Sequence, residues 1–173
     1  MTSGARTAEG VRHPWHEPPP EGQATQVAEG VLWMRLPLPM RLDHVNVYAL
    51  RDEDGWTVVD TGFDTGRGRE IWGRLLAGPL AGAPVVRVLA THQHPDHIGL
   101  AGWFVARGAE LWTSRTAWLF ARMLALDAQE RATAEQIAFW RRAGMDPDRL
   151  AQRASERPWN TADVVHMPVR YYR

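Results

Sequence analysis

Residues 91–97 read Thr-His-Gln-His-Pro-Asp-His, which places three histidines and one aspartate within six positions. A chain of this composition would contain such spacing by chance in about one case in a thousand or fewer. Residues 85–90, just before it, form a nearly continuous apolar run of the kind typical of a strand buried on both faces. Ligand sites in α/β proteins lie at the carboxyl ends of such strands. A solvated patch of surface histidines, the alternative, has no reason to follow a buried strand with this spacing.

The residue types in this stretch point to metal chemistry. On an extended segment His92 and His94 lie on the same side of the chain and can bind one ion. Pro95 favours a turn into a helix whose first turn would carry Asp96 and His97 toward a second, adjacent ion. A divalent ion lowers the pKa of a bound water from about 15.7 toward about 7, giving a hydroxide nucleophile at neutral pH. Hydrolysis of an activated carbonyl or phosphoester is the predicted chemistry.

The bulk composition limits the classes of ligand and partner. Lys+Arg and Asp+Glu number 20 each, so no basic field would attract nucleic acid or an anionic membrane. Cysteine is absent, which leaves histidine and carboxylate as metal ligands. No segment approaches the roughly 20 consecutive apolar residues of a membrane helix, and the N-terminus lacks the apolar core of a signal peptide. We therefore expect a cytoplasmic protein that acts on a small-molecule substrate.

The pattern along the chain predicts one α/β domain after a leader. Residues 1–22 are rich in glycine, proline and charge, and we expect a flexible leader there, followed by the domain at 23–173. Period-2 and helical spacings predict the elements of that domain. These are antiparallel strands at 27–36, 44–50 and 56–60, a helix at 64–77, a buried strand at 85–90, a helix at 98–107, and a strand at 110–113 that follows by a right-handed crossover.

The second part of the chain is predicted to be mostly helical. We expect a helical insertion at 114–157, with Pro147 in the first turn of one helix after Asp146. Its apolar residues, among them Trp118, Leu119, Met123 and Leu126, are interpreted as packing between helices. A lid that lines the substrate site is the alternative. Residues 164–167 are predicted to form a further strand.

The histidine stretch resembles the His-x-His-x-Asp-His motif of the metallo-β-lactamase superfamily, and the resemblance extends from about Gly30 to Gly108. It implies that His92 and His94 bind a first metal ion and that Asp96 and His97 bind a second. It also implies zinc as the metal, with iron or manganese as alternatives. Residues 60–62, Asp-Thr-Gly, match the family's turn after an early strand. By this resemblance Asp60 supports the metal-binding loop without binding the ion; capping of the helix near residue 64 is the alternative.

The resemblance implies a four-layer αββα sandwich built from two similar halves, of which this chain carries the N-terminal half with a helical insertion. The complete family site also needs a third histidine, a bridging aspartate and a last histidine. His166 follows the motif but lacks the matching context, so we interpret it as a half-buried strand histidine, and His44 as a rim or structural residue. A half-sandwich exposes one face of its sheet. We therefore expect a truncated chain, or one that needs a missing second half or a second copy of itself.

The leading functional hypothesis is a metal-dependent hydrolase of an ester, thioester, lactone or lactam, with Asp96 as the catalytic residue that orients the attacking water or accepts its proton. A second hypothesis is a non-catalytic half-domain that only binds metal. A third is an iron-dependent member of the same superfamily with oxygen or redox chemistry. A nucleic-acid-cleaving enzyme is not supported, because the sequence has no dense basic and aromatic run.

Overall fold

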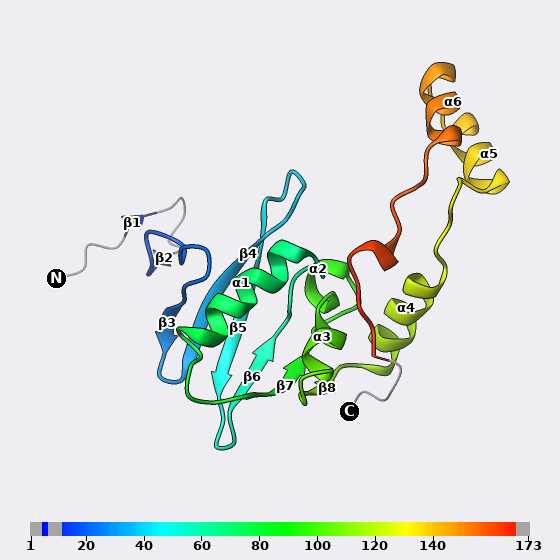
Figure 1. Ribbon diagram of the computed structural model, residues 1–173. Helices are drawn as coiled ribbons and strands as arrows, with labels where there is room; N and C mark the ends of the chain where they lie inside the picture. Colours follow the sequence, from blue (N-terminus) through cyan, green and yellow to red (C-terminus); the bar gives the residue numbers. More distant parts are fainter. Residues whose placement is uncertain (1–4, 7–11, 169–173) are drawn as a thin grey trace.

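The computed structural model describes residues 5–6 and 12–168 and centres on one six-stranded sheet of order β3-β4-β5-β6-β7-β8 (Figure 1). Its strands are β3 (Thr25–Ala28), β4 (Val31–Pro37), β5 (His44–Arg51), β6 (Trp56–Val59), β7 (Val85–Leu89) and β8 (Glu110–Trp112). Strands β3 to β6 pair antiparallel, and β6, β7 and β8 pair parallel. A separate pair, β1 (Ala5–Arg6) and β2 (Arg12–His13), precedes the sheet. The predicted α/β class is confirmed, and β7 and β8 pair in parallel as predicted.

The helices divide into a group beside the sheet and a group beyond it (Figure 1). They are α1 (Gly66–Ala77), α2 (Pro95–Ile98), α3 (Ala101–Val105), α4 (Arg115–Leu126), α5 (Ala134–Arg142) and α6 (Pro147–Ser155), with a 3-10 turn, η2, at Thr161–Asp163. Helix α1 begins at Thr65, whose hydroxyl accepts from the Gly68 amide at 3.0 Å. Trp72 of α1 is fully buried and packs edge-on against Phe104 of α3, with ring centroids 4.9 Å apart. Helices α1 and α3 therefore share one core over one face of the sheet.

Two sequence predictions about the strands are wrong. The strand expected at 27–36 is a hairpin of β3 and β4, because the chain turns at Gly30, whose φ of 68° suits glycine. The strand β7 was expected to be buried on both faces, but Leu89 is 37% exposed. An apolar run of five residues does not show how many faces are covered, since that depends on layers contributed by distant segments.

Two predictions about the region after β7 also need correction. The helix expected at 98–107 is divided into α2 and α3 around Gly99 and Leu100. The strand expected at 164–167 does not form; its backbone bonds instead to the helical turns, as His166 N–H donates to Gly99 O at 2.8 Å and Gly102 N–H donates to His166 O at 2.7 Å. The segment is extended, and its hydrogen-bond partners belong to helices rather than to a neighbouring strand.

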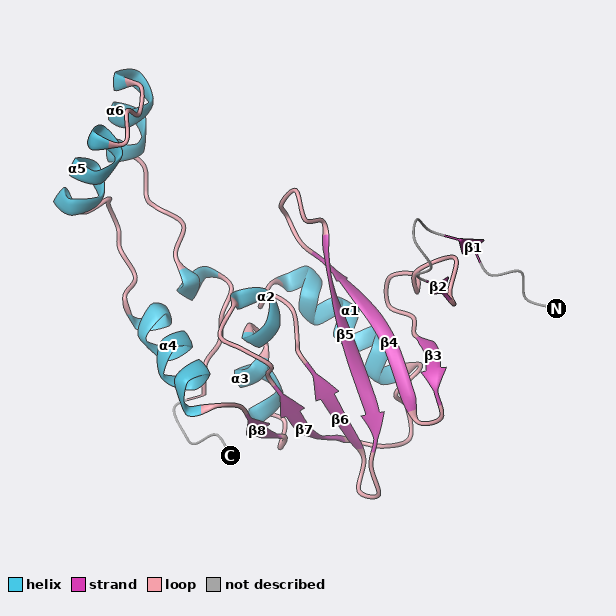
Figure 2. Cartoon of the chain, turned by 180° about the vertical axis from the view of Figure 1, so that it is seen from behind, coloured by secondary structure: helices cyan, strands magenta, loops and turns pink. Residues whose placement is uncertain are grey.

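Among the described residues, no helix packs on one face of the sheet, in keeping with the half-sandwich expectation (Figure 2 shows this face, with α1 behind). Strand pairing places Tyr48, Val59, Leu89 and Trp112 in one row across β5 to β8. Leu89 and Trp112 are each 37% exposed. On the same face the Arg87 guanidinium lies 4.3 Å from the centroid of the Trp112 ring. The face is therefore partly apolar and open.

Helices α4, α5 and α6 occupy the predicted helical region, and α5 and α6 form a hairpin that extends away from the sheet (Figure 1). Asp146 caps α6 by accepting from the Asp148 and Arg149 amides, with Pro147 in the first turn as expected. The packing interpretation is wrong for Leu119, Met123 and Leu126, which are exposed on α4. Throughout the described ranges, every helix is too short or too polar to cross a bilayer.

The expected boundary at residue 22 stays a prediction, although the last part of the proposed leader contacts the domain. Pro19 is buried. The Glu21 carboxylate pairs with Arg67 and Arg74 of α1, each at 2.6 Å. These two guanidinium groups lower the pKa of Glu21.

Candidate metal site

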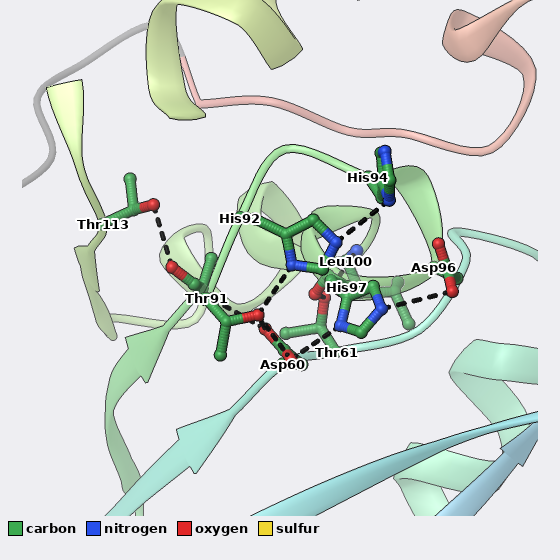
Figure 3. Close-up of polar contacts among 10 residues, drawn as sticks. Asp60, Thr61, Thr91, His92, His94, Asp96, His97, Leu100 and Thr113 are labelled. Atoms are coloured by element: carbon green, nitrogen blue, oxygen red, sulfur yellow. Dashed lines mark hydrogen bonds and ion pairs between the residues drawn. The ribbon is translucent and has the colours of Figure 1, made fainter. Parts of the chain in front are cut away.

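The histidine stretch forms the loop after β7 and the first turn of α2, and the segment after β6 holds it in place (Figure 3). Thr61 is fully buried and binds the carbonyl of His97 twice, through its amide at 2.7 Å and its hydroxyl at 3.0 Å. The same hydroxyl oxygen accepts from the Leu100 amide at 3.0 Å. Thr61 thus fixes the first turn of α2, which carries Asp96 and His97 as predicted.

Asp60 lies below the histidine stretch in Figure 3 and contacts Thr91 and His97. Asp60 is 5% exposed, and its side chain accepts from the Thr91 amide at 2.8 Å and from the Thr91 hydroxyl at 2.9 Å. It also accepts from Nδ1 of His97 at 2.7 Å. The alternative role as a helix cap is excluded, because Thr65 caps α1. Asp60 has a φ of 61°, a left-handed conformation that aspartate tolerates better than most residues.

These contacts determine which nitrogens of His92 and His97 carry protons. A carboxylate only accepts, so Nδ1 of His97 is the donor toward Asp60 and Nε2 keeps its lone pair in the neutral ring. Because the Thr91 hydroxyl gives its single proton to Asp60, its oxygen accepts from Nδ1 of His92 at 2.9 Å. Nε2 of His92 is then also unprotonated, and its lone pair can bind a metal ion. One buried carboxylate therefore orients two imidazoles, the arrangement that supports metal-binding histidines in proteins.

The surroundings of His97 and His92 shift the pKa values of these two side chains in opposite directions. The hydrogen bond that His97 donates to Asp60 raises the pKa of His97 above its usual value. Burial lowers the pKa of His92, helped by the neighbouring His97 and His94 rings. The His92 and His97 ring centroids lie 4.1 Å apart, so the two rings are close enough to oppose each other's protonation. His92 is thus kept in the neutral form that binds metals.

The four predicted ligands lie in two pairs. Nε2 of His92 is 3.0 Å from Nδ1 of His94, a contact that is favourable when a proton or a cation lies between the nitrogens. Two nitrogens on one tetrahedral zinc would lie roughly 3.3 Å apart, since Zn–N bonds are about 2.0–2.1 Å. Nε2 of His97 is 3.3 Å from Oδ2 of Asp96. The donor types and spacings fit zinc, but within residues 5–6 and 12–168 no three such side chains are grouped to hold an ion.

Comparison with known proteins identifies the family. Residues 40–166 match the sequence profile of the Metallo-beta-lactamase superfamily. The chain belongs to the metallo-β-lactamase superfamily. A β-lactamase domain protein from Burkholderia ambifaria shares 37% identity with a TM-score of 0.77, and the match covers 91% of this chain and 46% of that one. A metallo-β-lactamase family protein from Thermus thermophilus shares 27% identity with a TM-score of 0.55, over 85% of this chain and 46% of that one. No curated protein matches.

The chain therefore spans about half the length of the solved structures that it matches. His44 and His166 contact residues other than the four predicted ligands. His44 contacts Asp43 and Arg35 at the end of β5. The side chain of His166 is 51% exposed, which corrects the half-buried interpretation, and its Nδ1 lies 4.0 Å from Asp64.

Sequence reasoning missed two threonines of the candidate site. Thr91 belongs to the quoted stretch but was given no role, although its hydroxyl joins Asp60 to His92. Thr61 was treated only as part of the Asp-Thr-Gly match, although it binds α2. A hydroxyl next to a predicted ligand, and another next to a predicted supporting carboxylate, are the signals that could have identified them.

Gly99 allows three segments of the site to meet closely. A Cβ at this position would lie 2.4 Å from Gly62 O and 2.7 Å from Val164 O, which are backbone atoms that cannot rotate away. We expect Gly99→Ala to lower the free energy of unfolding by about 1–3 kcal/mol, the usual range for overpacking. Urea unfolding of the metal-free chain measures this change.

Gly73→Ala is the matched control for Gly99→Ala. Gly73 is exposed in α1, and nothing lies within 4 Å of its added Cβ. Alanine in a helix interior is more stable than glycine by about 0.5–1 kcal/mol, so this variant should be stabilised. Equal unfolding curves for the two variants would show that the backbone around Gly99 is not too closely packed to admit a Cβ atom.

Proposed function

We propose that this chain supplies one half of the active site of a metal-dependent hydrolase that cleaves an ester, thioester, lactone or lactam bond in a small molecule. The observation that carries the proposal is the pair of contacts from Asp60. They leave Nε2 of both His92 and His97 as lone-pair donors beside His94 and Asp96. Histidines oriented by a buried carboxylate are a feature of metal centres and have no evident purpose in a surface patch.

His92 and His94 would hold one ion, and Asp96 and His97 a second, with zinc as the metal. The ions would lower the pKa of a bound water and polarise the carbonyl of the substrate. Asp96 would orient the attacking water or take up its proton, because its side chain is 20% exposed and lies at 3.3 Å from His97. Asp60 and Thr91 would keep the two imidazoles in the metal-binding tautomer throughout.

A second candidate, a half-domain that binds metal without catalysis, is favoured by two observations. Across the described part of the chain, no three ligand side chains are grouped around one point. The chain also covers only 46% of the Burkholderia protein. With two ligands for each ion, binding would be weak, and any further ligands would have to come from another polypeptide segment.

The test compares this chain with a joined protein in which it is followed by the part of the Burkholderia chain that it does not match. Chromogenic ester, thioester, lactone and lactam substrates would be assayed with chelator and then with added zinc. We expect zinc-dependent turnover of at least one class by the joined protein. A joined protein that folds and binds zinc, iron or manganese but hydrolyses none of the four classes would reject the hydrolase in favour of the non-catalytic half.

A further inference from the structure

A cavity of about 390 Å³ opens directly beside Asp96. Met40, from the loop between β4 and β5, and Phe63, from the segment that holds α2, form part of its wall. Pro95 and Asp96 contribute from α2, and Trp159 and Val164 contribute from the segment after α6. Elements distant in the sequence thus meet around one hollow at the edge of the candidate metal site.

The lining of this cavity is apolar except at one point. Asp96 is the one ionisable residue in the described lining. The other described lining residues are aromatic, aliphatic, proline or methionine. None of them is a cation, so nothing in the lining would pair with a carboxylate or phosphate group of a ligand. The volume lies near the lower end of the roughly 300–1,000 Å³ typical of small-molecule sites. The cavity therefore suits an uncharged apolar group.

The next residue in the chain, Asn160, holds Trp159 at the cavity. Asn160 is 6% exposed, and its side chain accepts from the Gln129 amide at 2.8 Å and donates to the Gln129 carbonyl at 2.9 Å. These bonds tie together the two connections that lead to and from the hairpin of α5 and α6. The Trp159 side chain is nevertheless 61% exposed, and Met40 in the same lining is 51% exposed. Two large apolar side chains that line one cavity and remain exposed to solvent indicate a binding surface.

Val164, another residue of the cavity lining, is fixed to the segment between β6 and α1. Val164 O accepts from the Asp64 amide at 2.7 Å, and Val164 itself is buried. Asp96 belongs both to the cavity lining and to the ligand pair with His97. If an apolar group of the substrate bound beside Trp159 and Val164, the scissile bond next to that group would lie near Asp96 of the candidate metal site.

We propose that this cavity is the subsite for the apolar acyl or aryl group of the substrate, and that Trp159 is its specificity-determining residue. The proposal rests on the proposed function and narrows its substrate class to esters, thioesters, lactones or lactams with an uncharged, aromatic or short aliphatic group beside the scissile carbonyl. Trp159 lies just after the predicted helical insertion at 114–157, which contributes no residue to the described lining of the cavity.

The test is a titration of the 173-residue chain with methyl benzoate in the presence of chelator, followed by the indole N–H signals in ¹H–¹⁵N NMR spectra. Trp159→Phe identifies the signal of Trp159 by its loss. We expect this signal to shift in a saturable manner. Trp159→Ala should raise the Kd for methyl benzoate roughly tenfold, as expected for loss of an aromatic contact. Trp159 is exposed, so the variant should fold.

Trp15 and Trp112, exposed aromatics away from the cavity, are the controls. Their signals should move less than that of Trp159, and Trp15→Ala should leave the Kd unchanged. An unmoved Trp159 signal, or equal Kd values for Trp159→Ala and the parent chain, would overturn the proposal. Because the titration needs neither metal nor turnover, binding at Trp159 without hydrolysis would reject the proposed function alone. Hydrolysis without binding at Trp159 would reject the subsite alone.

Discussion

His94→Ala is expected to lower the zinc-dependent kcat/KM of the joined protein by more than about 100-fold. Nδ1 of His94 faces Nε2 of His92 at 3.0 Å, so the variant removes one of two imidazoles from the first pair. Loss of a residue that only supports a ligand costs about 10–100-fold in metal affinity or activity, and loss of the ligand itself should cost more. His94 is exposed, so the fold should keep its stability. Steady-state kinetics at a fixed free zinc concentration measures the change.

His44→Ala is the matched control for His94→Ala. His44 is also a partly exposed histidine, but its ring contacts Asp43 and Arg35 rather than the four predicted ligands. Turnover of this variant should stay within a few-fold of the parent. If His94→Ala retained its zinc-dependent turnover, the assignment of His92 and His94 to one ion would be wrong.

The parts of the site that follow from sequence are those made by neighbours in the chain. Alternation places His92 and His94 together, and Pro95 begins the turn that carries Asp96 and His97. Residues whose function depends on a distant segment were missed or only partly understood. Gly99 meets the carbonyls of Gly62 and Val164, and no local pattern predicts an approach between segments so far apart in the chain.

The errors in the fold have the same physical origin. The β-branched and aromatic residues at 27–36 do not distinguish one strand from a hairpin, and Gly30 alone marks the turn between β3 and β4. Apolar spacing on α4 predicted packing, but Leu126 is 70% exposed, because no described segment covers that side of the helix. Periodicity reports which residues share a face; it does not report whether another layer is present.

Asp60→Ala is expected to weaken both the fold and the metal site. The variant leaves the Thr91 amide, the Thr91 hydroxyl and Nδ1 of His97 without their acceptor. An unsatisfied buried donor costs about 1–3 kcal/mol, and alanine at a φ of 61° adds about 1 kcal/mol or more. We expect the free energy of unfolding to fall by about 3 kcal/mol and the zinc Kd to rise about 10–100-fold. Urea unfolding and competition with a chromophoric chelator measure these effects.

Two further variants separate the functions of Asp60. Asp60→Asn keeps the side-chain volume and tolerates the left-handed backbone, so it should lose less stability than Asp60→Ala while still losing zinc affinity. Thr91→Val keeps the hydrogen bond that His97 donates to Asp60 but removes the hydroxyl that orients His92. Its effect on zinc affinity should therefore be smaller than that of Asp60→Ala. NMR titration should show the pKa of His97 falling in Asp60→Ala, because the carboxylate that raises it is gone, and staying raised in Thr91→Val. An unchanged His97 pKa in Asp60→Ala, together with parental zinc affinity, would show that Asp60 supports neither imidazole and that the proton arrangement inferred for the site is wrong.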